Sequence, residues 1–304
     1  MSTEQTRDNN ASEVVVSVAQ LTRNFKRKTA LDDVSLEIPK GVVFGLVGEN
    51  GAGKTTLIRH LLGRLQPNAG SVQVFGLDPV KHPVEVLSRL GYLSEDRNLP
   101  GWMQVWELMR YTRAFYPSWD PDYAEELREQ FGLDPQAKIK NLSRGELART
   151  GLLIALAYRP ELLLLDEPSS GLDPIARRDI LEVIVRTVAE EGRTVVFSSH
   201  LLEEVDRVAD QIGMIHQGKL VFQGELEAIK AQHHHLILSR PGSTETIRIV
   251  VKAFTSLFVV WVMVVSIFAY FYPAYFTWIG PYIQPGLGLD IDLDALEQYT
   301  VRQS

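Results

Sequence analysis

The sequence predicts an α/β protein with a parallel sheet. Short β-branched or aliphatic runs alternate with helical patterns along the chain, as expected when helices cover a sheet. Two of these runs, 162–165 and 194–198, are almost continuously apolar, which is typical of strands buried on both faces. The chain has 304 residues, of which 45% are hydrophobic and 23% charged, so it can bury a core and is not globally disordered.

The elements can be placed in chain order from these patterns. Helices are expected at 57–65 and 175–190, and helical patterns rich in aromatic residues mark 84–160 as a helical insertion. Residues 211–224 hold two apolar runs around Gly218, which can adopt a positive φ, so a hairpin is expected there. The strands expected are 14–18, 34–38, 42–47, 72–75, 162–165 and 194–198.

The composition excludes several kinds of site. The chain has no cysteine, which removes disulfides, thiolate nucleophiles and cysteine-ligated metals. Its net charge of −7 disfavours stable binding to nucleic acid. The run His233–His235 is expected to be a solvated turn rather than a metal site, because consecutive residues of a helix or strand do not share one face.

The two ends of the chain differ from this core. Residues 1–13 are polar and acidic without a signal-peptide run, which predicts a chain that starts in the cytosol. Residues 253–272 are uncharged and mostly apolar, and as a helix they would be about 30 Å long, enough to span a bilayer. Basic residues prevail before this stretch and acidic ones after it, which predicts that the C-terminus lies outside. A buried core helix is the alternative.

A glycine-rich segment follows the strand expected at 42–47. It matches the phosphate-loop pattern GxxxxGK[ST] and lies between an expected strand and an expected helix, as a phosphate loop does. An ordinary glycine-rich turn before a helix is the alternative, and the match in this context disfavours it. Its backbone N–H groups and the helix N-terminus would hold phosphates, Lys54 would reach the β- and γ-phosphates, and Thr55 would hold Mg²⁺. The residues expected to bind nucleotide are Gly48, Glu49, Asn50, Gly51, Ala52, Gly53, Lys54, Thr55 and Thr56.

Two adjacent carboxylates, Asp166 and Glu167, end the apolar strand at 162–165. Carboxylates at the carboxyl edge of a parallel sheet face the crevice where ligands bind. Asp166 is therefore placed to bind Mg²⁺, and Glu167 to orient or deprotonate an attacking water. A solvated strand end is the alternative, and the phosphate loop argues against it.

With three further segments these motifs resemble the ATP-binding cassette (ABC) ATPases. Residues 141–146, which read NLSRGE, stand where that family has its LSGGQ-type signature, 170–174 match its D-loop, and His200 matches its switch histidine. The five motifs occur in the family's order and cover about residues 14–230. The resemblance is greatest to the ATPase subunits of bacterial multidrug-type and polysaccharide-type exporters.

The resemblance implies a two-lobed P-loop NTPase fold: a RecA-like parallel-sheet core, an antiparallel β subdomain and the helical insertion. It also implies a head-to-tail homo- or heterodimer, in which the phosphate loop of one subunit and the signature of the other hold each ATP. The implied roles fall on Phe25 for adenine stacking, on His200 and Glu167 for catalysis with Lys54, on Asp173 in the D-loop, and on Ser143, Arg144, Gly145 and Glu146 in trans. The residues alone predict a capping box at Ser143-x-x-Glu146 and a helix start at Asp173-Pro174.

Several positions depart from the family pattern. Arg144 and Glu146 replace the usual glycine and glutamine of the signature, and Phe25 stands where tyrosine is commoner. Glu95 occupies the Q-loop position, where it can bind Mg²⁺ directly or through water but adds negative charge beside ATP. The expected metal ligands are Thr55, Glu95 and Asp166, and hydrolysis is expected to be retained.

The function expected is the ATP-hydrolysing subunit of an exporter, bound to a transmembrane permease at the cytoplasmic face of the membrane. An ABC ATPase acting on ribosomes or DNA is the alternative, disfavoured by the single cassette and the acidic balance. Trp102 and Trp106 are expected either in the core or in the groove that receives the permease. The expected division is a flexible end at 1–13, a nucleotide-binding domain at 14–230, a linker at 231–252, a transmembrane helix at 253–272 and a tail at 273–304.

Overall fold

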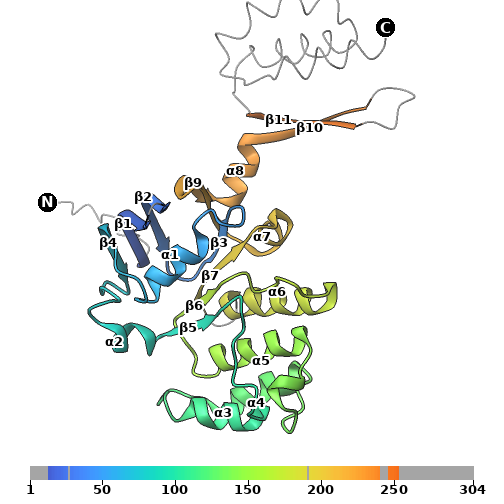
Figure 1. Cartoon of the computed structure of the whole chain (residues 1–304). Helices are drawn as coiled ribbons and strands as arrows, with labels where there is room; N and C mark the ends of the chain where they lie inside the picture. Colours follow the sequence, from blue (N-terminus) through green and yellow to red (C-terminus); the bar gives the residue numbers. More distant parts are fainter. Residues whose placement is uncertain (1–12, 27, 190–191, 240–245, 253–304) are drawn as a thin grey trace, which may run out of the picture. The chain divides into compact units, whose positions relative to one another are not determined.

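A computed structural model describes residues 13–26, 28–189, 192–239 and 246–252. The chain divides into a first unit, residues 1–228, and a second, residues 229–304, which are described separately. The first unit contains a six-stranded sheet in the order β5-β6-β7-β3-β8-β9 (Figure 1). Neighbours in it are parallel except β8 and β9, which form an antiparallel hairpin. Its strands are β3 (Val43–Val47), β5 (Leu90–Leu93), β6 (Leu162–Leu165), β7 (Thr194–Ser199), β8 (Gln211–His216) and β9 (Lys219–Glu225).

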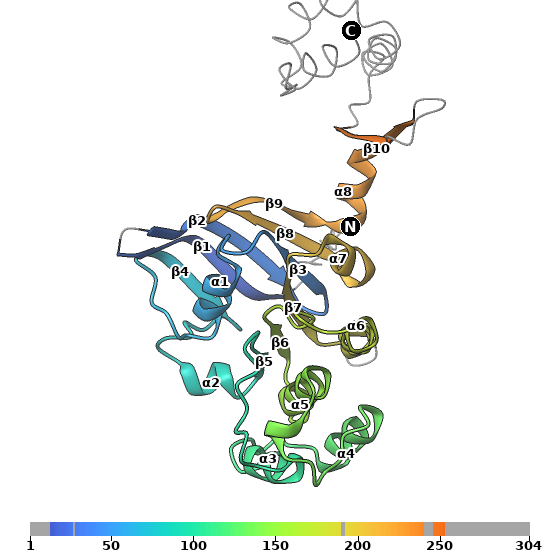
Figure 2. The ribbon, with the colours of Figure 1, turned by 45° about the vertical axis from the view of Figure 1, so that its right-hand side comes forward.

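A second, antiparallel sheet has the order β2-β1-β4. It consists of β1 (Val14–Phe25), β2 (Lys28–Pro39) and β4 (Ala69–Val74), and helix α1 (Lys54–Leu61) packs beside it (Figure 2). Leu21 of β1, Phe44 of β3 and Ile58 of α1 are fully buried in one hydrophobic cluster. The two sheets and α1 therefore share a core, which fixes the phosphate loop between β3 and α1.

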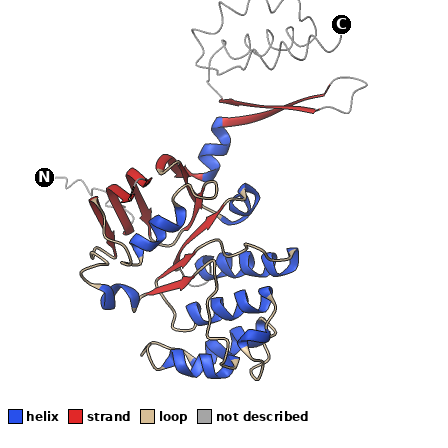
Figure 3. Cartoon of the chain, viewed as in Figure 1, coloured by secondary structure: helices blue, strands red, loops and turns tan. Residues whose placement is uncertain are grey.

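The helices gather mainly at one end of the six-stranded sheet (Figure 3). Those of the predicted insertion are α2 (Pro83–Leu87), α3 (Val105–Arg113), α4 (Pro121–Gln130), the 3-10 helix η1 (Ile139–Asn141) and α5 (Arg144–Leu156). The remaining helices are α6 (Pro174–Ala189), α7 (Leu202–Val208) and α8 (Leu226–Gln232). The insertion also contains strand β5, which the local pattern did not reveal, because a four-residue run becomes a strand only through its pairing with β6.

The predicted α/β class is confirmed, and most differences lie at the ends of elements. β1 and β2 are twelve residues each, longer than predicted, because they pair with each other almost throughout. The first helix ends at Leu61 rather than at 65, since Gly63 adopts a φ of 68°. The predicted hairpin is confirmed, with Gln217 and Gly218 at φ 48° and 82° in its turn.

The second unit contains an antiparallel hairpin of β10 (His233–Ser239) and β11 (Thr246–Lys252). The predicted linker at 231–252 therefore includes two strands, and the solvated turn expected at His233–His235 is wrong. These residues begin β10, where their backbone pairs with the β-branched end of β11. The predicted span at 253–272, the tail at 273–304 and residues 1–12 lie outside the described residues. Within the described ranges no helix has both the length and the apolar character needed to cross a bilayer.

Candidate functional site

The phosphate-loop segment joins the carboxyl end of β3 to the first residue of α1. Lys54 opens that helix, and its side chain is 5% exposed. Its ammonium donates to the backbone carbonyl oxygens of Gly48 at 2.6 Å and Glu49 at 3.1 Å, so the lysine folds back over its own loop. Gly53, the residue before the helix, has a φ of 120°, which strongly favours glycine.

Glycine is also required at this position because of close packing. A Cβ on Gly53 would lie 2.7 Å from the carbonyl oxygen of Ala30 in β2. The loop is further held by the β8–β9 hairpin, whose Gly218 N–H donates to the Ala52 carbonyl oxygen at 2.9 Å. The loop geometry therefore depends on two hairpins from distant parts of the chain.

Asp166 lies beside Thr55 at the same edge of the sheet. The Thr55 hydroxyl donates to Asp166 Oδ1 at 3.1 Å, and the Ser198 hydroxyl donates to the same oxygen at 2.9 Å. Burial raises the pKa of Asp166, while these two hydrogen bonds act in the opposite direction. A buried carboxylate with a neighbouring hydroxyl offers the hard oxygen ligands that Mg²⁺ prefers.

Glu167 is a second buried carboxylate of the site and contacts two potentially cationic side chains. Its Oε1 lies 3.0 Å from Lys54 Nζ, and its Oε2 lies 2.7 Å from His200 Nδ1. The residue is 4% exposed and adopts a φ of 47°, a conformation that is costly for a residue with a side chain. The Glu167 carboxylate thus lies between the phosphate-loop lysine and a histidine that directly follows β7, the next strand along the chain.

Two buried residues, Ser199 and Glu204, form a polar network next to His200. The hydroxyl of the preceding residue, Ser199, donates to Glu204 Oε2 at 2.7 Å, and Glu204 Oε1 lies 3.3 Å from Arg177 Nε. Glu204 belongs to α7 and Arg177 to α6, so the strand end that carries His200 is tied to both helices. This network fixes the backbone from which His200 projects.

The signature segment begins α5. Ser143 caps this helix: its hydroxyl accepts from the Glu146 N–H, and its own N–H donates to Glu146 Oε2, so the predicted capping box is confirmed. A Cβ on Gly145 would lie 3.1 Å from the Ala176 Cβ and 3.9 Å from Asp173 Oδ2. The signature therefore packs against the start of α6 in its own subunit.

The D-loop prediction concerns the start of α6. Asp173 Oδ1 accepts from the N–H groups of Ile175 and Ala176, each at 3.0 Å, and Pro174 is the first helical residue. The predicted helix start is confirmed. Arg144 lies close by, since its Nη1 is 3.3 Å from the position that a Cβ on Gly171 would occupy.

The remaining predicted site residues lie at its margins. Phe25 is 40% exposed at the end of the β1–β2 hairpin, with the Arg23 guanidinium 4.7 Å from its ring centroid. Glu95 is exposed in the turn after β5 and has no hydrogen bond to Thr55 or Asp166 among the described contacts. Trp102 is 72% exposed and precedes α3, so it is not on one helix with Trp106, and its placement in the core is excluded.

Two residues of the site were missed by the sequence reasoning. The Ser198 hydroxyl accepts from the Glu167 N–H at 2.9 Å besides donating to Asp166. Pairing the two predicted strands in parallel would have placed Ser198 beside Asp166. In the structure β6 and β7 are parallel neighbours, Leu165 is paired with Phe197, and Ser198 directly follows Phe197. Arg97, buried beneath the turn that follows Glu167, gave no signal of this kind.

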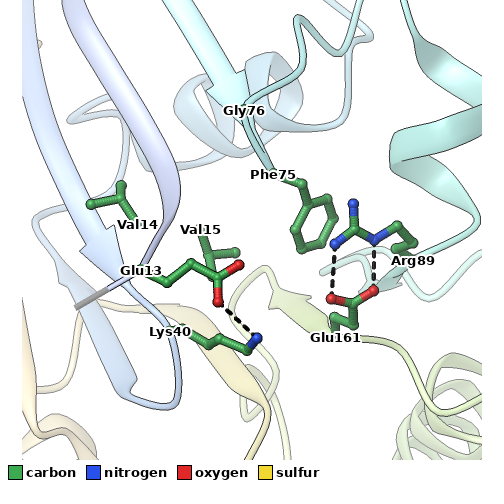
Figure 4. A pocket seen from close by; sticks show the side chains of 8 residues that line it. All are labelled: Glu13, Val14, Val15, Lys40, Phe75, Gly76, Arg89 and Glu161. Atoms are coloured by element: carbon green, nitrogen blue, oxygen red, sulfur yellow. Dashed lines mark hydrogen bonds and ion pairs between the residues drawn. The ribbon is translucent and has the colours of Figure 1, made fainter. Parts of the chain in front are cut away.

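A separate hollow of about 230 Å³ lies at the other edge of the sheet (Figure 4). Its walls carry the ion pairs Lys40–Glu13, at 2.9 Å, and Arg89–Glu161, at 2.6 Å. Glu161 directly precedes β6, whereas Asp166 directly follows it, so the hollow and the carboxylates stand at opposite ends of the same strand. Its charges are already paired, and its volume is below the usual range for ligand pockets.

The described residues thus place two carboxylates, one lysine, one threonine and one histidine at the carboxyl edge of a parallel sheet. This arrangement can bind phosphates and a divalent cation beside a base. Within the described chain, no group of three or more His, Asp or Glu residues could hold a metal by itself.

Comparison with known proteins agrees with this geometry. The family model described as "ABC transporter" matches residues 31–170. The ABC transporter ATP-binding protein YtrB of Bacillus subtilis is 32% identical over 219 residues, covering 72% of this chain and 75% of YtrB. The bacitracin transport ATP-binding protein BcrA of Bacillus licheniformis is 31% identical over 221 residues, covering 72% of each chain.

Solved structures show the same fold. The ATP-binding cassette MJ0796, whose dimeric structure represents a post-hydrolysis state bound to ADP and Pi, superposes with a TM-score of 0.63 at 23% identity. The superposition covers 69% of this chain and 98% of the cassette.

Proposed function

The chain belongs to the ATP-binding proteins of ABC transporters, which hydrolyse ATP, and on this premise we propose that it drives export through a partner permease. The observation that carries the proposal is the contact of Glu167 with both Lys54 and His200. A base, a phosphate-binding cation and a histidine converge there in a buried position, as ATP hydrolysis requires.

The proposal assigns one role to each of the predicted site residues. Lys54 binds the β- and γ-phosphates, Glu167 orients and deprotonates the attacking water, and His200 contacts the γ-phosphate. Thr55 and Asp166 would hold Mg²⁺, which would neutralise phosphate charge, and the exposed Glu95 would be a further ligand, directly or through water. Phe25 stacks on adenine, an assignment supported by the packing of Ala30, five residues later, against Gly53 of the loop.

We propose further that the site is completed by a second cassette. The signature residues Ser143–Glu146 and the loop at 48–56 share no hydrogen bond or ion pair within the described chain. Figures 1 and 2 both show α5 well apart from α1, with β6 and β7 between them. The N-terminus of α5 offers free N–H groups and a positive dipole end to an anion, so a head-to-tail partner would present it to the ATP of the other subunit.

Mixing variant subunits tests this arrangement. Lys54→Ala and Gly145→Asp subunits should each be inactive, whereas their mixture should recover part of the ATPase activity, because one of the two composite sites is then intact. The control is a mixture of Lys54→Ala and Glu167→Gln subunits. Both substitutions alter the half of a composite site that contains the phosphate loop, so neither site of the mixed dimer is intact and no activity should be recovered. Failure of the first mixture at every ratio would exclude the head-to-tail dimer.

Transport in the outward direction rests on the resemblance and on the relatives. BcrA is named for bacitracin transport, and this chain is 31% identical to it over 72% of its length. The exposed Trp102 ring lies on the helical region, where an apolar surface suits a permease contact. Co-purification of a multi-span permease with the full chain would support the proposal, and co-purification with ribosomes or DNA instead would favour the alternative class.

We also propose that residues 253–272 anchor the chain, with the cassette on the cytoplasmic face. The full chain should then stay in carbonate-washed membranes, and a C-terminal cysteine tag should react with a label added from outside. Val262→Arg, a charge in the middle of the stretch, should weaken retention because it costs about 3 kcal/mol at a helix centre. A wild-type chain released by carbonate, or a tag labelled only from inside, would contradict the anchor.

A further inference from the structure

Arg97 is a buried cation that the proposed reaction does not use. It is 8% exposed, and its Nη2 donates to two backbone carbonyl oxygens, that of Pro168 at 2.8 Å and that of Ser170 at 2.9 Å. Its Nε has no hydrogen-bond partner among the described residues. Burial lowers the pKa of this guanidinium, which nevertheless stays charged at neutral pH. Burying a cation costs free energy of folding unless its hydrogen bonds offset that cost, so the role of these hydrogen bonds is worth examining.

The two carbonyl groups belong to the turn that carries Glu167. The Ser170 N–H donates to the Glu167 carbonyl oxygen at 3.1 Å, closing the turn, and Glu167 itself has a φ of 47°. On the sheet side, the Asp166 N–H donates to the Leu93 carbonyl oxygen at 2.9 Å. Without Arg97, the carbonyl groups of Pro168 and Ser170 would lose their charged donor on the other side of the turn.

The backbone of Arg97 is held equally tightly. Its φ is 46°, and its N–H donates to the Ser94 carbonyl oxygen at 3.2 Å. Arg97 is thus itself in the left-handed region, and its guanidinium binds a turn whose first residue, Glu167, is in that region too. Such backbone conformations persist only where the surroundings determine them and are concentrated at functional sites.

We propose that Arg97 is a positioning residue for Glu167: by donating to the Pro168 and Ser170 carbonyl oxygens it holds the turn in the orientation that directs the Glu167 carboxylate at Lys54 and His200. It acts on the chemical step and not on nucleotide binding, because the hydrogen bonds described for its side chain go to the turn and not to the phosphate loop. The inference rests on the proposed role of Glu167 as the base.

Steady-state ATPase kinetics of the full-length protein test the inference. Arg97→Ala should lower kcat about tenfold or more, because a small displacement of a catalytic group costs rate steeply, while KM for ATP stays within about twofold. Arg97→Lys should give an intermediate kcat, since it keeps a cationic donor but not the guanidinium geometry. Arg89→Ala is the matched control: it removes an arginine paired with Glu161 at the far edge of the sheet and should leave kcat unchanged.

The double variant separates positioning from a general structural role. In a Glu167→Gln background, Arg97→Ala should cause less than about a twofold further loss, because the group that Arg97 orients is already disabled. An undiminished further loss, an unchanged kcat in Arg97→Ala, or a rise in KM accompanied by a lower Tm would each overturn the inference. Should Arg97→Ala fail to fold, the same comparisons are made with Arg97→Lys.

The same measurements distinguish this inference from the proposed function. Wild-type turnover in Glu167→Gln would remove the base assignment and the inference together. Loss of turnover in Glu167→Gln with unimpaired Arg97→Ala and Arg97→Lys would leave the base in place and refute the role of Arg97 alone.

Discussion

Glu167→Gln should bind ATP at least as tightly as the wild type and hydrolyse it about a hundredfold to ten-thousandfold more slowly. The amide keeps the size of the carboxylate but cannot accept a proton, and a general base contributes about this factor. The geometry adds a reason for tight ATP binding. The substitution removes a negative charge 3.0 Å from Lys54 Nζ, so the carboxylate no longer competes with the phosphates for this ammonium group. Single-turnover hydrolysis and nucleotide titration of the same preparation measure both effects.

The accumulation of an ATP-bound dimer on size-exclusion chromatography is the second expected property of this variant. Glu161→Gln is the matched control, since it alters a carboxylate at the opposite end of β6 and should leave turnover unchanged. If Glu167→Gln retains wild-type turnover, Glu167 is not the base, and Glu95 becomes the next residue to test.

Lys54→Ala should weaken ATP binding by about thirtyfold or more. Removing one partner from a buried charge pair costs roughly 2 kcal/mol or more, which for the pair of Lys54 with the β- and γ-phosphates corresponds to about thirtyfold in affinity. The loop itself should change as well, because the Gly48 and Glu49 carbonyl oxygens lose their ammonium donor. Titration with a fluorescent ATP analogue measures the affinity.

Lys40→Ala provides the comparison for this variant. Lys40 is also ion-paired, with Glu13 at 2.9 Å, but its side chain is half exposed and lies away from the phosphate loop. Its removal should leave ATP affinity unchanged. An unaltered affinity in Lys54→Ala, with a thermal unfolding profile like that of the wild type, would refute the assignment of the nucleotide site.

The capping and turn features of the protein could be predicted from the sequence because they depend on residues that are close together in the chain. The capping box at Ser143 and Glu146 follows from a three-residue spacing, and the turn at Gly218 from a residue that tolerates positive φ. The strand at Leu162–Leu165 was placed with its observed bounds, since a continuous apolar run of this length is typical of a strand buried on both faces.

Other features escaped because they depend on partners elsewhere in the chain. β5 is a strand only beside β6, and His233–His235 form strand rather than turn only opposite β11. Trp102 and Trp106 have helical spacing, yet the helix begins between them, with Gln104 as its cap. A spacing rule cannot detect where an element starts when the capping residue is not one of the usual ones.

The sequence by itself determined that this protein has a phosphate loop, a strand ending in Asp166 and Glu167, and the motif order of an ABC ATPase. Only the tertiary structure decided which of these groups touch. Thr55 meets Asp166 from 111 positions away, Glu167 is held between Lys54 and His200, and Arg97 reaches the carbonyl oxygens of Pro168 and Ser170. Periodicity and capping report contacts within a few residues, whereas these contacts are fixed by the order of parallel strands in the sheet, which brings the ends of β3, β5, β6 and β7 to a single edge.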